Sequence, residues 1–219
     1  MNFCNLIKVL VFSIALLMSP YSLYADNSKL NKVLLELKSS DVKTRKAAIS
    51  DYEVLERNIA LEYIECLVPL LKDYKVKEDC VRMIGHLFIP PQAIRGVYIT
   101  RTFGIERIEP NVNYRNASEK IIPYLIPLLS DQDEDVREAT AETLCYIGSP
   151  ARKALTQLKD MLNDRVAYVR HNALLAIVNI EPCGIGVLTI SKQMLNDDSE
   201  TVRKLANEAI QYLSSIKCN

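Results

Sequence analysis

The stretch DEDVREATAETLCYIG, residues 133–148, recurs in altered form twice further along the chain. The later copies are DRVAYVRHNALLAIVNIE, residues 164–181, and DDSETVRKLANEAIQYLS, residues 197–214. Each copy contains the pair Val-Arg, and the arginines of successive copies are 33 residues apart. These arginines are Arg137, Arg170 and Arg203. A period of about 20–50 residues indicates a repeat architecture, in which each unit packs against its neighbours.

The same frame extends upstream, where Arg45 and Lys77 occupy the position of the arginine. Three residues after this position the side chain is always small: Ala48, Cys80, Thr140, Ala173 and Ala206. Seven residues after it the side chain is large: Tyr52, Ile84, Leu144, Ile177 and Ile210. These offsets fall on one face of an α-helix. We therefore expect one helix per unit, with a small-residue column that lets a neighbouring helix approach closely.

A second apolar segment precedes each of these helices, as in IIPYLIPLLSD, residues 121–131. A short polar turn such as SDQDED joins the two, so each unit is predicted to be a helical hairpin. The preceding helices end near Leu37, Leu71, Leu129, Leu162 and Leu195. One hairpin cannot bury its apolar face alone, but about five in series can do so by stacking. The predicted fold class is therefore all-α.

These units resemble HEAT repeats, which carry Pro-Leu-Leu near the end of the first helix, Asp in the turn, and then Val-Arg, a small residue and Leu. The resemblance is closest over residues 117–216 and looser over residues 29–88. It implies a right-handed α-solenoid of about five hairpins, formed by residues 26–219 and interrupted by one irregular insertion.

The resemblance also implies a structural ladder of charge-assisted hydrogen bonds between each turn Asp and the Arg six residues later. The residues concerned are Asp131, Arg137, Asp164, Arg170, Asp197 and Arg203. Ser39 replaces the Asp of the first unit, and the second unit has a shorter turn with Lys77 in place of Arg. The ladder is therefore not expected to be complete in the second unit.

The insertion covers residues 89–115, between the second and third units, and contains three prolines and two glycines. Arginine and aromatic residues alternate along it, and these residue types are enriched in protein-binding hot spots. The candidate partner-binding residues are Arg95, Tyr98, Arg101, Phe103, Arg107 and Tyr114. The alternative is that the insertion only pads the junction between repeats. The chain is expected to re-enter the repeat at Asn116 and Glu119, which have the spacing of a capping box.

Residues 1–25 differ from the rest of the chain. Lys8 is followed by the apolar run VLVFSIALLM, residues 9–18, and by a segment that ends at Ala25. This layout predicts a secretory signal peptide, because the apolar run is shorter than the ~20 residues of a membrane span. The exported chain would be periplasmic or secreted, without stable membrane insertion once the signal is cleaved. The alternative is a membrane tether formed by an uncleaved N-terminal segment.

Five cysteines would remain after cleavage: Cys66, Cys80, Cys145, Cys183 and Cys218. Their spacing fits no zinc pattern, and the sequence does not assign disulfide pairs among them. Cys80 belongs to the small-residue column and is predicted to lie in the core. The two histidines are His86 and His171. Neither is next to a Glu, so the His-Glu iron pairs of the HEAT-like enzyme deoxyhypusine hydroxylase are absent. We predict no metal and no cofactor, and His171 is expected to be a surface residue.

Basic and acidic residues are balanced at 27 each, so no overall charge favours nucleic acid. The favoured function is an exported scaffold that binds a protein or peptide partner without catalysis. The alternative is an enzyme or enzyme accessory, similar to the HEAT-like phycobilin lyases, with a site near residues 89–115. The sequence predicts no catalytic residue.

Overall fold

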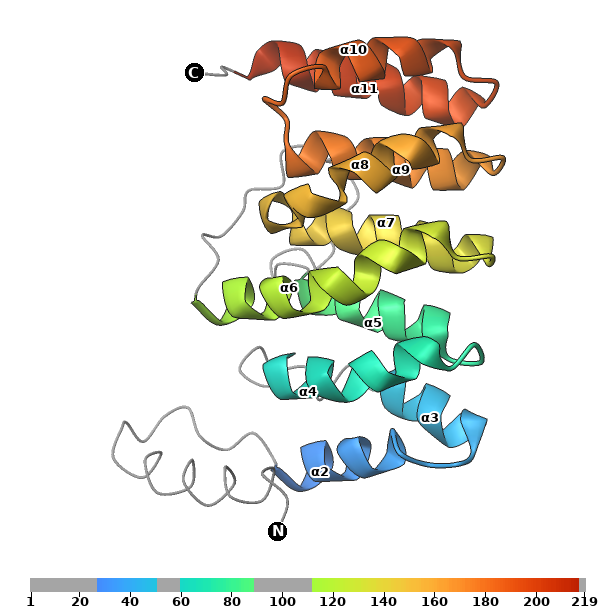
Figure 1. Ribbon diagram of the computed structural model, residues 1–219, viewed down its shortest axis with the longest axis vertical. Coiled ribbons are helices and arrows are strands. Elements are labelled where there is room, and N and C mark those ends of the chain that lie inside the picture. Colours follow the sequence, from blue (N-terminus) through green and yellow to red (C-terminus); the bar gives the residue numbers. More distant parts are fainter. Residues whose placement is uncertain (1–26, 51–59, 89–111, 217–219) are drawn as a thin grey trace.

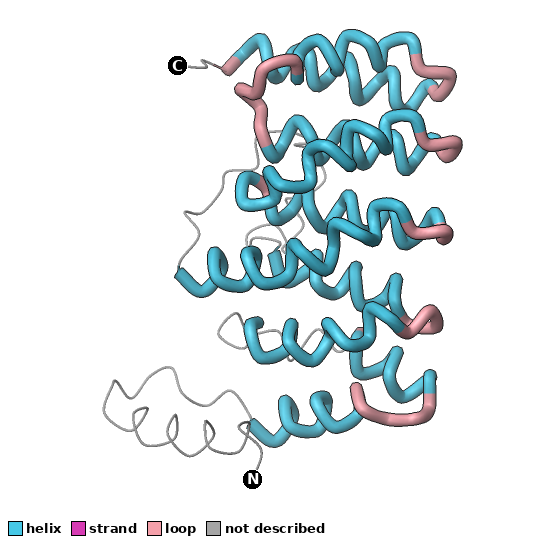
Figure 2. Tube along the Cα trace, in the orientation of Figure 1, coloured by secondary structure: helices cyan, strands magenta, loops and turns pink. Residues whose placement is uncertain are grey.

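The computed structural model describes residues 27–50, 60–88 and 112–216. Every regular element within these residues is a helix, and they contain no strand (Figures 1 and 2). The helices form five hairpins that stack in chain order, from α2 at one end to α11 at the other (Figure 1). The prediction of an all-α solenoid of about five helical hairpins is therefore confirmed.

Each hairpin has a first helix and a second helix. The first helices are α2 (Asn27–Glu36), α4 (Ala60–Leu67) continued by η3 (Val68–Lys72), α6 (Val112–Leu125) continued by η5 (Ile126–Ser130), α8 (Leu155–Asp160) between η6 (Ser149–Ala154) and η7 (Met161–Asn163), and α10 (Val187–Gln193) continued by η8 (Met194–Asn196). The second helices are α3 (Val42–Ile49), α5 (Lys77–Phe88), α7 (Glu134–Ile147), α9 (Ala167–Ile180) and α11 (Glu200–Ser215).

Proline explains why two first helices tighten into 3₁₀ geometry before they end. Pro69 is the second residue of η3, and Pro127 is the second residue of η5. Proline has no N–H to donate to the carbonyl four residues earlier, so it removes one α-helical hydrogen bond and weakens the α-helical pattern, although α6 does accommodate Pro123. Short 3₁₀ turns are a common way to finish such a helix.

An aspartate then turns the chain in four of the five hairpins. The carboxylate of each accepts the backbone N–H two residues further on, at 2.8–3.1 Å. These residues are Asp73, Asp131, Asp164 and Asp197. In the first unit the Ser39 hydroxyl accepts the Asp41 N–H at 3.1 Å, so a serine makes the same kind of turn. Short polar side chains that hydrogen-bond their own backbone in this way are typical turn formers.

The core lies between the two layers of helices. All five residues of the small column are fully buried: Ala48, Cys80, Thr140, Ala173 and Ala206. The prediction that Cys80 is a core residue is confirmed, and burial raises the pKa of its thiol to about 12. Two polar groups in this core are satisfied locally, because Thr140 and Ser191 donate to the carbonyls four residues earlier.

The second helices α5 and α7 approach each other especially closely at Gly85. A Cβ atom at this position would lie 2.7 Å from Thr143 Oγ1. The Thr143 hydroxyl donates to the carbonyl of Val81 at 3.0 Å, one turn before Gly85. The missing side chain therefore permits a direct bond from one unit to the backbone of the next.

The last second helix differs from the others on its outward side. Four and eight residues after the arginine position, α9 places Leu174 and Val178, which are fully buried. At the same positions α11 places Asn207 and Gln211, which are exposed. This side of α11 is therefore suited to contact with water rather than to apolar stacking.

Two predictions from the sequence are wrong in detail. Helix α6 begins at Val112, so Tyr114 and Arg115 belong to a regular helix and not to the irregular segment. Asn116 consequently lies inside α6 and does not cap it. The spacing of Asn116 and Glu119 thus occurs within a helix, which packs on α4 with Lys120 bonded to Glu65 at 2.7 Å. The rest of the predicted insertion, residues 89–111, lies outside the described residues, as does Tyr52.

Candidate functional site

The second helices form the inner side of the stack. Each packs directly against the next, α5 on α7, α7 on α9 and α9 on α11, whereas successive first helices contact one another less. In a curved stack of layers, the layer with the closer spacing lies on the inside of the curve. The side chains of the second helices that point away from the first helices therefore line the concave face.

Helix geometry identifies these side chains as those one and five residues after the arginine position. On α5 they are Glu78 and Arg82, and on α7 they are Glu138 and Glu142. They meet between the two helices. Arg82 donates to Glu78 at 2.8 Å, to Glu138 at 2.8 Å and to Glu142 at 3.5 Å.

Two further side chains complete this group. Tyr146 donates its hydroxyl to Glu142 at 2.7 Å, and Asn172 of α9 donates its amide to Glu138 at 2.7 Å. We call the six residues the inner-face cluster: Glu78, Arg82, Glu138, Glu142, Tyr146 and Asn172. The cluster links three successive units. Lys46 of α3 pairs with Asp79 at 2.9 Å and extends the polar row toward the first unit.

The inner-face cluster holds three carboxylates around one guanidinium. Burial raises the pKa of Glu138, although Arg82 acts against this shift. Burial by itself would lower the pKa of Arg82. The hydrogen bonds to Glu78 and Glu138 outweigh burial, so the pKa of Arg82 is above its usual value. The side chains of Glu78, Arg82 and Glu142 stay 33–40% exposed. The cluster therefore presents uncompensated negative charge to the concave face.

Both histidines lie near this face. Partial desolvation and the charge of Arg82 lower the pKa of His86, although the charge of Glu142 acts against them. His171 is half-buried, and burial lowers its pKa despite a hydrogen bond with the backbone of Thr201 in α11. The prediction that His171 is a surface residue is therefore wrong, because α11 packs against its helix. Within residues 27–50, 60–88 and 112–216, no group of three His, Cys, Asp or Glu side chains could hold a metal ion.

The predicted ladder residues lie at the turns, along one edge of the stack. Arg137 donates to the backbone carbonyls of Asp131 and Gln132 in its own turn, at 2.8 and 3.1 Å. Its other nitrogens bind both carboxylate oxygens of Asp164, in the next unit, at 2.8 and 3.1 Å. The arginine thus contacts the backbone, not the carboxylate, of the Asp six residues before it.

The same arrangement continues along the stack. Arg170 binds the Asp164 carbonyl and the carboxylates of Asp197 and Asp198. Arg203 binds the carbonyls of Asp197 and Asp198, and no carboxylate among the described residues contacts it.

The first two units also take part, although the sequence indicated a gap there. Arg45 reaches Asp73 at 2.6 Å, and Lys77 reaches Asp131 at 2.6 Å. Asp73 lies four residues before Lys77 rather than six, so the fixed spacing did not identify it. Partial burial by itself would raise the pKa of Asp131. The hydrogen bonds from Lys77 and from the Asp133 N–H outweigh burial and hold this pKa below its usual value.

The other predicted site residues are not brought together by the described structure. Arg95, Tyr98, Arg101, Phe103 and Arg107 lie outside the described residues. Tyr114 lies in the first turn of α6. The sequence did not single out the inner-face cluster, because its columns alternate in sign. The available signal was that Glu78, Arg82, Glu138 and Glu142 lie one and five residues after the arginine position.

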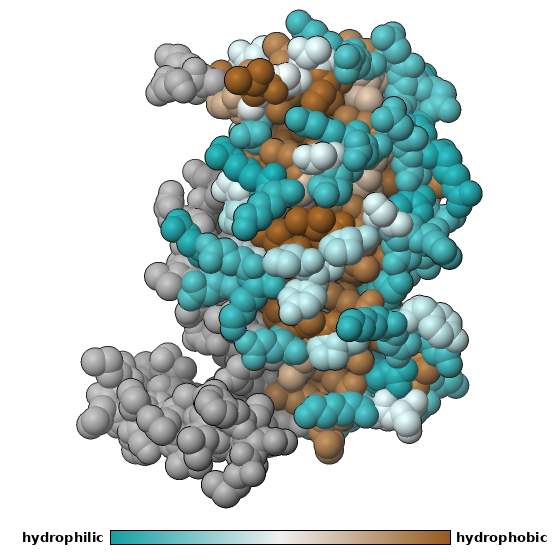
Figure 3. Space-filling model, viewed as in Figure 1, coloured by the Kyte–Doolittle hydropathy of each residue, from teal (hydrophilic) through white to brown (hydrophobic). Residues whose placement is uncertain are grey.

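The opposite side of the stack, formed by the first helices, has a different character. Figure 3 shows apolar side chains reaching the surface along the middle of this side, with hydrophilic side chains along the edge formed by the turns. Leu35, Tyr124 and Leu188 are exposed there by 72%, 52% and 39%. None of the helices in the described residues is both long and apolar enough to cross a membrane.

The cysteines divide into two kinds. Cys66, Cys80 and Cys145 are not disulfide-bonded. Cys183, in the turn between α9 and α10, is disulfide-bonded.

An α-solenoid of stacked helical hairpins defines the class of protein. Within it, residues 111–178 match the family model of HEAT repeats. The prediction that the chain is built from HEAT-like repeats is confirmed by this match and by its structural neighbours. The search of curated proteins found no match to the sequence.

Similar solved structures come from designed and natural proteins. A designed armadillo repeat protein in complex with the peptide (KR)4 is 20% identical, with a TM-score of 0.58 over 84% of this chain and 81% of that one. The CpcE–CpcF phycocyanin lyase of Nostoc sp. PCC7120 is 20% identical, with a TM-score of 0.58 over 90% and 69%. An archaeal HEAT-like repeats protein from Thermococcus onnurineus NA1 is 17% identical, with a TM-score of 0.55 over 89% and 74%. At these identities the likeness shows the fold alone.

The ladder generates a stability prediction. Arg137→Ala should lower the free energy of unfolding by roughly 3 kcal/mol, because it leaves the Asp164 carboxylate partly buried without its cation. Arg203→Ala is the matched control and should cost only about 1 kcal/mol, since it loses bonds to carbonyls that water can replace. Urea unfolding followed by circular dichroism measures both. Equal losses for the two variants would contradict a role for the carboxylate in joining the units.

Proposed function

We propose that this solenoid is a non-catalytic scaffold that binds a protein or peptide partner along the inner face of its second helices. The observation that carries the proposal is the inner-face cluster, a row of partly exposed polar side chains from three successive units with more carboxylates than cations. Stacked repeats create extended concave surfaces on which successive units contact successive parts of a ligand.

The charge of the cluster favours a partner segment that carries basic residues. A lysine or arginine side chain beside Glu78 and Glu142 would compensate the carboxylates that Arg82 leaves unbalanced. The designed armadillo repeat protein with a similar fold binds (KR)4, a peptide of lysine and arginine. That likeness supports the proposal through shape only, and the charges come from this chain.

The predicted binding residues of the segment 89–115 stay part of this proposal. Arg95, Tyr98, Arg101, Phe103, Arg107 and Tyr114 would add arginine and aromatic contacts to the partner. Helix α5 ends at Phe88 and helix α6 begins at Val112, so this segment connects the second unit to the third.

Binding of a fluorescent (KR)4 peptide tests the inner face by anisotropy. Glu78→Gln combined with Glu142→Gln should weaken binding at least fivefold, because both carboxylates are lost while their shape is kept. Glu119→Gln, an exposed residue of α6 on the other side, is the matched control and should change nothing. Equal affinity of the two variants, or equal binding of an acidic peptide of the same length, would overturn the proposed surface.

The natural partner can then be sought by affinity capture from exported material. The wild-type chain should retain a protein that the double glutamine variant loses. A chain that lacks residues 90–110 should keep its helicity and also lose that protein. Retention by both variants would show that neither surface binds it.

A second candidate function is that of an enzyme or an enzyme accessory. The similarity of fold to the CpcE–CpcF phycocyanin lyase favours this function. The site of such an enzyme would use the side chains of His86 and Arg82. Metal analysis and an absorption spectrum of the purified chain distinguish the two functions. The scaffold should contain no stoichiometric iron or zinc and no absorbing pigment. A bound metal or chromophore would favour the enzyme.

Export is also part of the proposal. Residues 1–25 have the layout of a signal peptide, and the disulfide at Cys183 is of a kind that persists in oxidising compartments. Exported material should therefore begin at Asp26 by N-terminal sequencing. Mass spectrometry without reduction should find Cys183 in a disulfide. A mature chain that retains residues 1–25 would instead support the membrane tether.

A further inference from the structure

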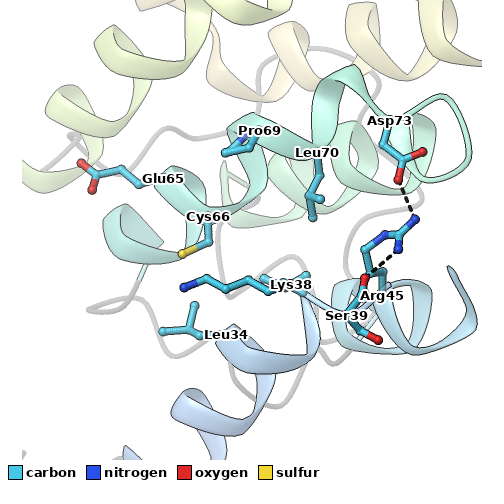
Figure 4. A pocket seen from close by; sticks show the side chains of 10 residues that line it. Leu34, Lys38, Ser39, Arg45, Glu65, Cys66, Pro69, Leu70 and Asp73 are labelled. Atoms are coloured by element: carbon cyan, nitrogen blue, oxygen red, sulfur yellow. Dashed lines mark hydrogen bonds and ion pairs between the residues drawn. The ribbon is translucent and has the colours of Figure 1, made fainter. Parts of the chain in front are cut away.

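A cavity of about 530 Å³ opens between the first two units, on the side of the first helices (Figure 4). Its walls come from the end of α2 on one side and from α4 and η3 on the other. The apolar part of the lining is formed by Leu34, Leu37, Cys66, Pro69 and Leu70. Cavities of about 300–1,000 Å³ with mostly apolar walls are typical of small-molecule sites.

The cavity exists because the first helices are spaced unequally. Helix α4 packs against α5 and α6, and Glu65 ties it to Lys120 of α6 at 2.7 Å. Helix α2 packs chiefly against its own partner α3. The gap between α2 and α4 is therefore left open, and Leu34 and Leu70 remain half-buried on its two walls.

The charges around the cavity are matched except for one. Arg45 and Asp73 pair with each other at 2.6 Å and close the end near the turn (Figure 4). Glu65 forms an exposed ion pair with Lys120 at 2.7 Å. Lys38 extends across the mouth of the cavity, and no carboxylate in the described part of the chain pairs with it (Figure 4). The unmatched charge is thus a single ammonium at the rim of an apolar cavity.

We propose that this cavity binds a small amphiphilic monoanion, a molecule with an apolar body and one carboxylate or sulfonate group. The apolar body would cover Leu34, Leu70 and the floor formed by Leu37, which is only 2% exposed. The anionic group would accept hydrogen bonds from the Lys38 ammonium, since this side chain lines the same cavity. The site lies on the outer side of the stack and does not depend on the proposed function of the inner face.

Fluorescence titration with 8-anilinonaphthalene-1-sulfonate, which combines an aromatic body with one sulfonate, tests the site. Decanoate should displace this probe, whereas decyltrimethylammonium, with the same chain and the opposite charge, should not. Lys38→Gln should weaken decanoate binding at least fivefold. Lys32→Gln, on α2 six residues before Lys38 and with a side chain 73% exposed, is the matched control and should leave binding unchanged.

Alkylation of Cys66 gives a second readout that locates the ligand. Cys66 is the partly exposed thiol of the cavity wall, while Cys80 and Cys145 are 0% and 4% exposed. Decanoate should slow the reaction of Cys66 with iodoacetamide, as followed by peptide mass spectrometry, and Lys38→Gln should remove this protection. Unchanged alkylation at saturating decanoate, or equal decanoate affinity for the two lysine variants, would overturn the proposal.

Discussion

Each turn aspartate joins two units at once, and the order of the stack depends on this interaction. The carboxylate of Asp164 accepts the Val166 N–H of its own turn and both guanidinium bonds from Arg137 of the preceding unit. Apolar packing between helices is not directional, so it does not by itself fix how far one hairpin slides along the next. The paired hydrogen bonds supply that direction. Partial burial by itself would raise the pKa of Asp164. These hydrogen bonds outweigh burial, hold the pKa below its usual value and keep the carboxylate ionised.

The tight inner side and the looser outer side follow from how the units pack in this register. On the inside, the buried small column and Gly85 let α5 and α7 approach until Thr143 bonds the backbone of Val81. Charged side chains of neighbouring second helices then come within hydrogen-bond distance and form the inner-face cluster. On the outside, the first helices contact one another less and apolar surface reaches the solvent, as it does at the cavity between α2 and α4.

The two sides consequently offer different chemistry to ligands. The concave side is polar and carries excess negative charge around Arg82, which suits an extended basic segment of a partner. The outer cavity is apolar with one ammonium at its rim, which suits a small molecule of opposite polarity.

Sequence periodicity alone determined the fold class, the five hairpins and the buried small column, because the stacking of similar units repeats the same local environment at the same offsets from Arg45, Lys77, Arg137, Arg170 and Arg203. It could not place the start of α6, because the capping-box spacing of Asn116 and Glu119 also occurs inside that helix. It also missed Asp73 as a ladder residue, because the shorter second turn changes the spacing while the geometry at the turn is kept. Only the tertiary structure decided which carboxylate each arginine binds, that Glu78, Glu138 and Glu142 share one guanidinium, and that Lys38 lies over an open cavity. These contacts join different units, and a periodic sequence specifies what each unit contains but not the distances between its side chains and those of its neighbours.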